Sequence, residues 1–170
     1  VYGRFDAGIR VGGRLEKDMV AVRLTPDFDM VAVASPEYLA RHGTPKSPTD
    51  LHEHACINWR LQADGSNYRW EFDKRGQRID VAVEGPVVTN HADIGIAAAL
   101  EGLGIAYHFV QDGVEELLAQ GRLARVLAEW SVSRPGLFLY YPHRQHKPAA
   151  LRAFIDCLLD RNPSALTSSP

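Results

Sequence analysis

The chain has 170 residues, 45% of them hydrophobic and 24% charged, which suffices for a buried core in one domain or in two small lobes. Nineteen basic and 21 acidic residues leave a net charge of -2, which argues against this stretch holding DNA by itself. No apolar run approaches the ~20 residues that span a bilayer, and the N-terminus lacks the pattern of a signal peptide.

The first third of the chain predicts strands followed by a short helix. Alternating or continuous apolar residues predict strands at 5–11, 19–24 and 29–34. Ser35 is a good N-cap, Pro36 fits the first helical position, and Gly43 is typical of the end of this helix. The segment 44–55 carries two prolines and predicts a connection over the surface, before a short strand at 55–59.

The rest of the chain alternates between strand and helix signals. A turn at Lys74 to Gly76 predicts a hairpin between two of the strands. Strands are expected at 70–73, 78–84, 87–89, 103–106, 123–127 and 136–141. Helices are expected over Ile94 to Leu100, over 112–121 and from Pro148 onward. The apolar stripe of the last helix comprises Leu151, Phe154, Ile155, Leu158 and Leu159.

The stretch from Pro86 to Phe109 reads as one βαβ unit and is the most informative part of the sequence. Thr89 and Asn90 are predicted to cap its helix, with Gly102 just past the helix end. Amide groups left free at the start of this helix would lie beyond the carboxyl end of a strand. Open α/β sheets bind small anionic or polar ligands there, so the unit predicts a binding pocket.

The order of several segments resembles the effector-binding region of LysR-type transcriptional regulators. The similar segments are FDAGIRVG, VAVASPEYLARHGTPKSPTDLHEHACINW, VVTNHADIGIAAALEGLGIAYHFV, EELLAQGRLARVL and LYYPHRQHKPAALRAFIDCLLD. The resemblance covers about residues 4 to 161. It implies an α/β, two-lobed fold like that of type 2 periplasmic binding proteins, with the first lobe incomplete in this chain. It assigns 1–58 to the first lobe, 59–142 to the second, 143–161 to a helix returning to the first, and 162–170 to a tail.

The resemblance also implies partners. A small-molecule effector, anionic or aromatic, is expected between the lobes, and DNA is expected to be bound by a helix-turn-helix domain that this chain lacks. A homodimer or tetramer is expected, without a cofactor, a metal or a membrane partner. The candidate effector-binding residues are Val11, Gly12, Gly13, Asn58, Arg60, Thr89, Asn90, His91, Tyr107, His108 and Phe109.

Each group of candidates also has a purely structural interpretation. The glycines after Val11 either let the backbone approach a ligand closely or form a tight turn. Arg60 is a possible bidentate partner of a carboxylate, with Trp59 stacking on a ring, or both belong to ordinary packing and solvation. The polar and aromatic residues from Tyr107 to Phe109 indicate an aromatic or hydrogen-bonding pocket.

Other functions have weaker support. His52, His54 and Cys56 alternate like metal ligands on a strand, but a polar loop is favoured. GxSxG, HExxH, Walker and GxGxxG patterns are absent, so an enzyme is not expected. Cys56 and Cys157 predict free thiols in a reducing compartment, which gives a cytoplasmic expectation. A stand-alone solute-binding module and an interaction module without ligand stay open as alternatives.

Overall fold

The structure is a computed structural model that describes residues 5–12, 18–61, 64–110, 112–143 and 149–161. It divides the chain into two compact units. Unit 1 consists of Val1–Phe28 together with Ser133–Pro170, and unit 2 consists of Asp29–Val132. The chain therefore passes between the units twice. These boundaries do not coincide with the lobe segments expected from the sequence, and the assignment of lobes stays a prediction.

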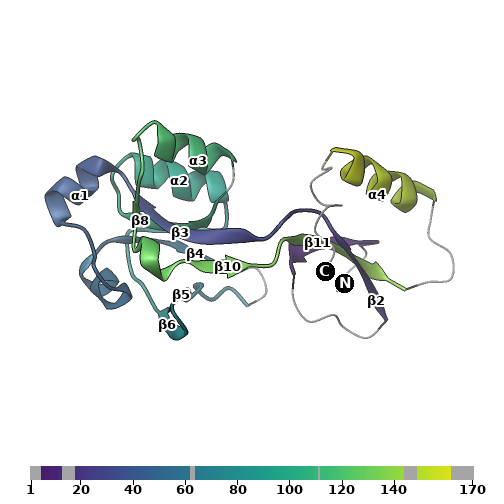
Figure 1. Cartoon of the computed structure of the whole chain (residues 1–170), viewed down its shortest axis with the longest axis horizontal. Coiled ribbons are helices and arrows are strands. Elements are labelled where there is room, and N and C mark those ends of the chain that lie inside the picture. Colours follow the sequence, from purple (N-terminus) through teal and green to yellow (C-terminus); the bar gives the residue numbers. More distant parts are fainter. Residues whose placement is uncertain (1–4, 13–17, 62–63, 111, 144–148, 162–170) are drawn as a thin grey trace. The chain divides into compact units, whose positions relative to one another are not determined.

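Unit 1 contains a three-stranded antiparallel sheet and one helix (Figure 1). Strand β11 (Leu137–Pro142) lies between β1 (Gly8–Val11) and β2 (Met19–Arg23), and helix α4 spans Ala149–Arg161. Both N-terminal strands thus pair with the C-terminal strand and not with each other. No helix of the described residues has the length and apolar character needed to cross a membrane.

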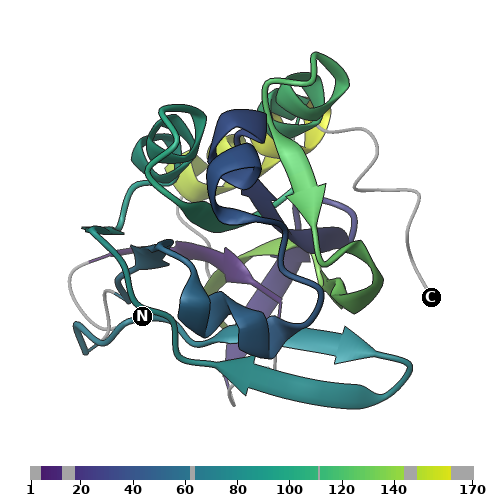
Figure 2. The same cartoon turned by 90° about the vertical axis from the view of Figure 1, so that its left-hand side faces the viewer.

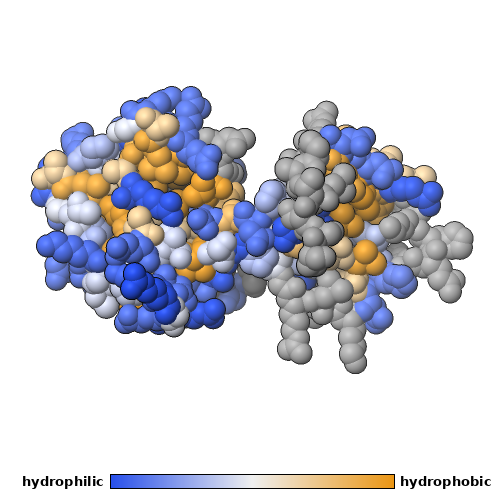
Figure 3. Space-filling model, viewed as in Figure 1, coloured by the Kyte–Doolittle hydropathy of each residue, from blue (hydrophilic) through white to orange (hydrophobic). Residues whose placement is uncertain are grey.

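The core of unit 1 lies between α4 and one face of this sheet. Its buried members are Leu24, Leu139, Tyr141 and Ile155. The expected stripe of α4 is correct except for Phe154, which is 49% exposed, because helical spacing puts this residue at the edge of the stripe. Large apolar side chains also remain exposed on and before β1, namely Phe5, Ile9 and Val11. Figure 3 shows apolar surface beside α4 in this unit.

Unit 2 is built on a mixed sheet with the strand order β10-β3-β8-β4-β7, and β9 pairs with β3. The strands are β3 (Phe28–Ala34), β4 (Cys56–Trp59), β7 (Val87–Thr89), β8 (Ile105–Phe109), β9 (Ala124–Val126) and β10 (Val132–Arg134). Strand β4 runs parallel to both β7 and β8, and β3 runs antiparallel to β8 and β9. The predicted βαβ unit exists, but β4 separates its two strands.

Packed layers cover both faces of this sheet (Figures 1 and 2). Helices α2 (Ala92–Leu100) and α3 (Asp112–Ala119) lie on one face, with a core around Val31, Val33 and Ala99. The hairpin of β5 (Trp70–Lys74) and β6 (Gln77–Val81) lies on the other face. The predicted hairpin is therefore confirmed. Its core contains Trp70, Phe72, Val81, Tyr107 and Trp130.

Short helices complete unit 2. Helix α1 (Pro36–His42) begins as expected, because the Ser35 hydroxyl accepts a hydrogen bond from the Tyr38 amide at 3.2 Å. The segment expected as a surface connection instead forms a 3-10 helix, Pro48–Glu53, and Leu51 within it is fully buried. Ser47 and Asp50 form its capping box, which fixes the turn so that Leu51 faces the core. A further 3-10 helix, Ala128–Trp130, precedes β10.

Candidate functional site

Three strands of unit 2 end at the same edge of the sheet. Because β4 is parallel to β7 and β8, the residues after Trp59, Thr89 and Phe109 lie along its carboxyl edge. The Arg60 amide donates a hydrogen bond of 2.8 Å to the Thr89 carbonyl, which ties two of these ends together. The edge therefore brings Asn58, Arg60, Thr89, Asn90, His91, His108 and Phe109 onto neighbouring strand ends. It is the position at which open α/β sheets bind ligands.

Helix α2 starts beside this edge, but not with the cap expected from the sequence. It begins at Ala92 with His91 as N-cap, and no described side chain caps its amides. The predicted capping by Thr89 and Asn90 is wrong, because the Thr89 hydroxyl instead accepts the His91 amide at 3.0 Å in the preceding turn. The first helical hydrogen bond runs from Gly95 to the His91 carbonyl. The positive end of the helix thus stays open to an acceptor.

Asn58 is a buried polar residue near the end of β4. It is only 2% exposed, and its Oδ1 atom has no hydrogen-bond partner among the described residues. Strand alternation puts its side chain on the same face as Cys56, which belongs to the core beneath the β5–β6 hairpin. Since an unpaired buried acceptor is unfavourable, this position suits a donor that the described residues do not supply.

His108 lies on the opposite face, beneath α2. It is 5% exposed, and its Nδ1 atom lies 2.8 Å from the Phe109 carbonyl. A carbonyl oxygen only accepts, so Nδ1 carries the proton and Nε2, which has no described partner, is an acceptor. Burial lowers the pKa of His108, against the opposing effects of the Phe109 carbonyl and Asp93. The ring is therefore neutral at pH 7.

Tyr107 has a structural role in the core beneath the β5–β6 hairpin. Its hydroxyl donates to the Glu71 carbonyl, and its ring stacks on Trp70 with centroids 5.1 Å apart. It is 8% exposed, so packing under the hairpin uses most of its surface. Its proposed contact with a ligand stays a prediction.

The remaining candidates belong to unit 1. Val11 is exposed at the end of β1, and the Gly12 amide donates to the Gly136 carbonyl at 2.9 Å. Gly13 lies outside the described residues. The candidate residues are thus divided between the two units, and contact of one ligand with all of them stays a prediction.

The alternating His52, His54 and Cys56 do not form a metal site in the described part of the chain, which holds no cluster of three suitable side chains. His54 Nδ1 instead lies 3.2 Å from the Tyr38 hydroxyl. Burial lowers the pKa of His54, and His42 adds to this effect. Burial raises the pKa of the Cys56 thiol to about 12, so that this sulfur is not a thiolate.

A family model and individual relatives point to the same protein family. Residues 2–163 match the family model described as the LysR substrate binding domain. The chain is 42% identical over 158 residues to the HTH-type transcriptional regulator PgrR of Escherichia coli, covering 93% of the chain and 52% of that protein. It is 31% identical over 175 residues to the HTH-type transcriptional regulator PtxR of Pseudomonas aeruginosa, covering 98% of the chain and 53% of that protein. The chain spans about half the length of these curated relatives.

Similar solved structures are regulatory domains of transcriptional regulators. The regulatory domain of AphB from Vibrio vulnificus matches with a TM-score of 0.74 and 28% identity, over 93% of this chain and 76% of that one. The regulatory domain of CrgA, a LysR-type transcriptional regulator from Neisseria meningitidis, matches with a TM-score of 0.71 and 27% identity, over 92% of this chain and 75% of that one.

Proposed function

Because the chain belongs to the LysR substrate-binding domain family, we propose that it senses a small-molecule effector on behalf of a DNA-binding transcriptional regulator. The observation that carries this proposal is the carboxyl edge of β8, β4 and β7, where the uncapped start of α2 lies beside Thr89, Asn90 and His91. This edge offers amide donors and polar side chains, which suit the binding of a small polar molecule.

The chemistry of this edge favours an effector with an anionic group. Free amides at the positive end of α2 stabilise a carboxylate or phosphate oxygen, and the exposed Arg60 adds a cation at the end of β4. Trp59 and Phe109 end the neighbouring strands and provide aromatic surface. A compact anion with an aromatic ring therefore fits these residues best.

Regulation follows from a shift in populations. An effector alters output only if it binds one arrangement of the regulator better than another. DNA binding is assigned to a helix-turn-helix part outside this chain, since relatives that carry this name are about twice as long. A homodimer or tetramer would transmit the change to DNA, and a regulator of this kind works in the cytoplasm. Light scattering of the complete protein tests the oligomer, and a monodisperse monomer would contradict it.

Titration tests the site. A thermal-shift screen of aromatic carboxylates and organic phosphates on the complete protein identifies a probe, whose affinity is then measured by calorimetry. We expect Asn90→Ala and His91→Ala to weaken binding of an anionic probe about tenfold, which is the loss of one charge-assisted hydrogen bond. His108→Ala removes the acceptor Nε2, so we expect it to weaken binding of a probe that also carries a donor group. His52→Ala is the matched control, because His52 is exposed on the 3-10 helix Pro48–Glu53, before the start of β4. Unchanged affinity in all three site variants would overturn this site.

A further inference from the structure

The two passages of the chain between the units leave unit 1 side by side. The first passage follows β2 through Thr25, Pro26 and Asp27, and the second returns through Pro135 and Gly136 into β11. Proline lacks an amide proton and fixes its own φ angle, so regular strand pairing is interrupted in both segments. Beyond the last paired residues of β2 and β11, side chains form hydrogen bonds between the two segments.

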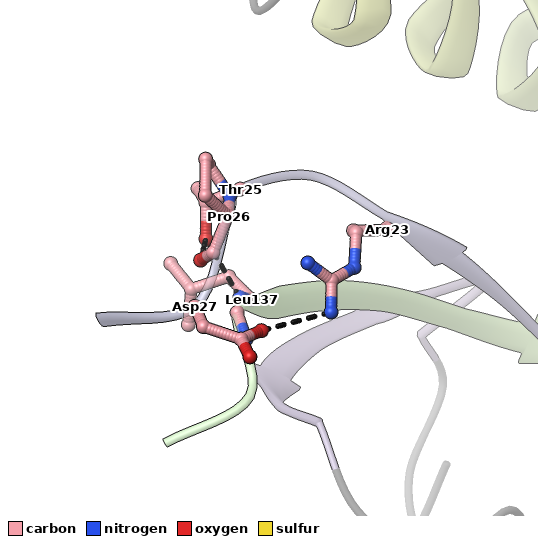
Figure 4. Close-up of polar contacts among 6 residues, drawn as sticks. Arg23, Thr25, Pro26, Asp27 and Leu137 are labelled. Carbon is pink, nitrogen blue, oxygen red and sulfur yellow. Dashed lines mark hydrogen bonds and ion pairs between the residues drawn. The ribbon is translucent and has the colours of Figure 1, made fainter. Parts of the chain in front are cut away.

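Thr25 connects the two segments twice. Its Oγ1 atom accepts a hydrogen bond of 2.8 Å from the Leu137 amide, and its own amide donates to the Leu137 carbonyl at 3.3 Å. The Leu24 amide donates to the same carbonyl at 2.7 Å. Figure 4 shows Thr25 directly against Leu137.

Asp27 adds a charged link. Its Oδ1 atom accepts a hydrogen bond from Arg23 Nη2 at 2.9 Å (Figure 4). The same oxygen accepts from the Gly136 amide at 3.3 Å, so it joins β2 to the returning segment. Gly136 permits this approach, because a Cβ atom there would lie 2.0 Å from the Thr25 carbonyl oxygen. We call Arg23, Thr25, Asp27, Gly136 and Leu137 the crossover clamp.

The crossover clamp is also bonded to a candidate site residue. The Gly136 carbonyl accepts the Gly12 amide at 2.9 Å, at the end of β1. A Cβ atom on Gly12 would lie 2.6 Å from the Phe138 ring, so this strand end is held tightly against the start of β11. The end of β1 and the crossover clamp therefore share a backbone hydrogen bond.

We infer that Thr25 and Asp27 are positioning residues that hold the two connecting segments at a fixed spacing and thereby limit how freely the units reorient. The clamp belongs wholly to unit 1 and stands on its own contacts. Its consequence for regulation rests on the proposed function, because reorientation of the units is what an effector would have to bias.

Hydrogen exchange on the complete protein tests the clamp. Thr25→Val keeps the shape of the side chain and removes the acceptor for Leu137, so we expect exchange of the Leu137 amide to rise roughly fivefold. Thr25→Ser keeps a hydroxyl and should restore slow exchange. Asp27→Ala should speed exchange at Gly136. Asp29→Ala is the matched control, since this exposed carboxylate, two residues further along in β3, has no side-chain hydrogen bond among the described residues.

Distance measurements test the consequence. Spin labels on the exposed Cys157 of unit 1 and on Glu115→Cys in unit 2 report the spread of distances between the units in the complete protein, and the buried Cys56 is not labelled. The distribution should broaden in Thr25→Val and Asp27→Ala and stay unchanged in Asp29→Ala. Unchanged distributions and exchange rates in both clamp variants would overturn the inference. Broadening without any change in expression from a regulated promoter supports the clamp and counts against the proposed function.

Discussion

The sheet of unit 2 carries packed layers on both faces, whereas the described part of unit 1 has one helix over a three-stranded sheet. Trp70, in the larger core, is 1% exposed, and Phe154, on the helix of unit 1, is 49% exposed. Since buried apolar area supplies most of the free energy of folding, we expect unit 2 to hold most of the stability, and it also contains the carboxyl edge proposed to bind ligand. Substitutions in the two units should therefore change the free energy of unfolding by different amounts.

The largest effect is expected for Trp70→Ala. This side chain packs between the sheet and the β5–β6 hairpin and stacks on Tyr107, so its removal leaves a large cavity. We expect the free energy of unfolding of unit 2 to fall by about 3 to 5 kcal/mol. Native-state hydrogen exchange of β4 and β8 amides measures the loss. A value under about 1 kcal/mol would contradict the assigned core.

A pair of glycines compares backbone crowding in the two units. A Cβ atom on Gly85 would lie 1.9 Å from the Cys56 carbonyl oxygen, whereas none of the described atoms lies within 4 Å of a Cβ atom on Gly8 of β1. Gly85→Ala should therefore destabilise unit 2 by about 2 to 3 kcal/mol. Gly8→Ala should stabilise unit 1 by about 0.5 kcal/mol, because the unfolded chain loses freedom. Hydrogen exchange in each unit checks both signs.

Acid should weaken unit 2. The pKa values of His54 and His108 are lowered mainly by burial, so protons bind the unfolded chain better than the folded one. The stabilisation is complete above about pH 6.5 and is lost as the pH falls through the lowered values, by at most about 1.4 kcal/mol per pH unit for each histidine. The double variant His54→Gln, His108→Gln should show a flatter dependence of unfolding free energy between pH 7 and pH 5. An unchanged slope of unfolding free energy against pH would show that neither histidine takes up a proton on unfolding.

Phe154→Ala should have the smallest effect. Its ring is half exposed on α4, so the free energy of unfolding should change by less than about 0.5 kcal/mol. Thermal unfolding of the complete protein measures it beside Trp70→Ala. A fall in the free energy of unfolding as large as that of Trp70→Ala would mean that this ring is buried in the complete protein. The difference between the units would then be smaller than the described residues indicate.

Local signals predicted most elements. Ser35 and Pro36 fixed the start of α1, and the turn at Lys74 to Gly76 fixed the hairpin, because capping and turn preferences act over a few residues. Leu51 could not be placed, since its burial depends on a core built from distant strands. The insertion of β4 between β7 and β8 is likewise a long-range pairing that no local pattern encodes.

The candidate site was predicted in part. The βαβ pattern correctly indicated strand ends beside the start of α2, but the start of that helix was misplaced because Thr89 bonds within the preceding turn. The missing partner of Asn58 depends on packing across the sheet and has no signal in the sequence. The crossover clamp was missed, although Pro26 and the Pro135–Gly136 pair mark both of its segments.

The pairing of β1 and β2 with β11 has a consequence for synthesis on the ribosome. Both strands are made before unit 2, whereas the strand that bonds to each of them is made only after all of unit 2. Unit 2 is one continuous segment and is free to fold while translation continues. Among the described residues, β1 and β2 therefore have no strand partner until Leu137–Pro142 leaves the exit tunnel. If translation stalled before that point, their exposed edges would need protection by chaperones.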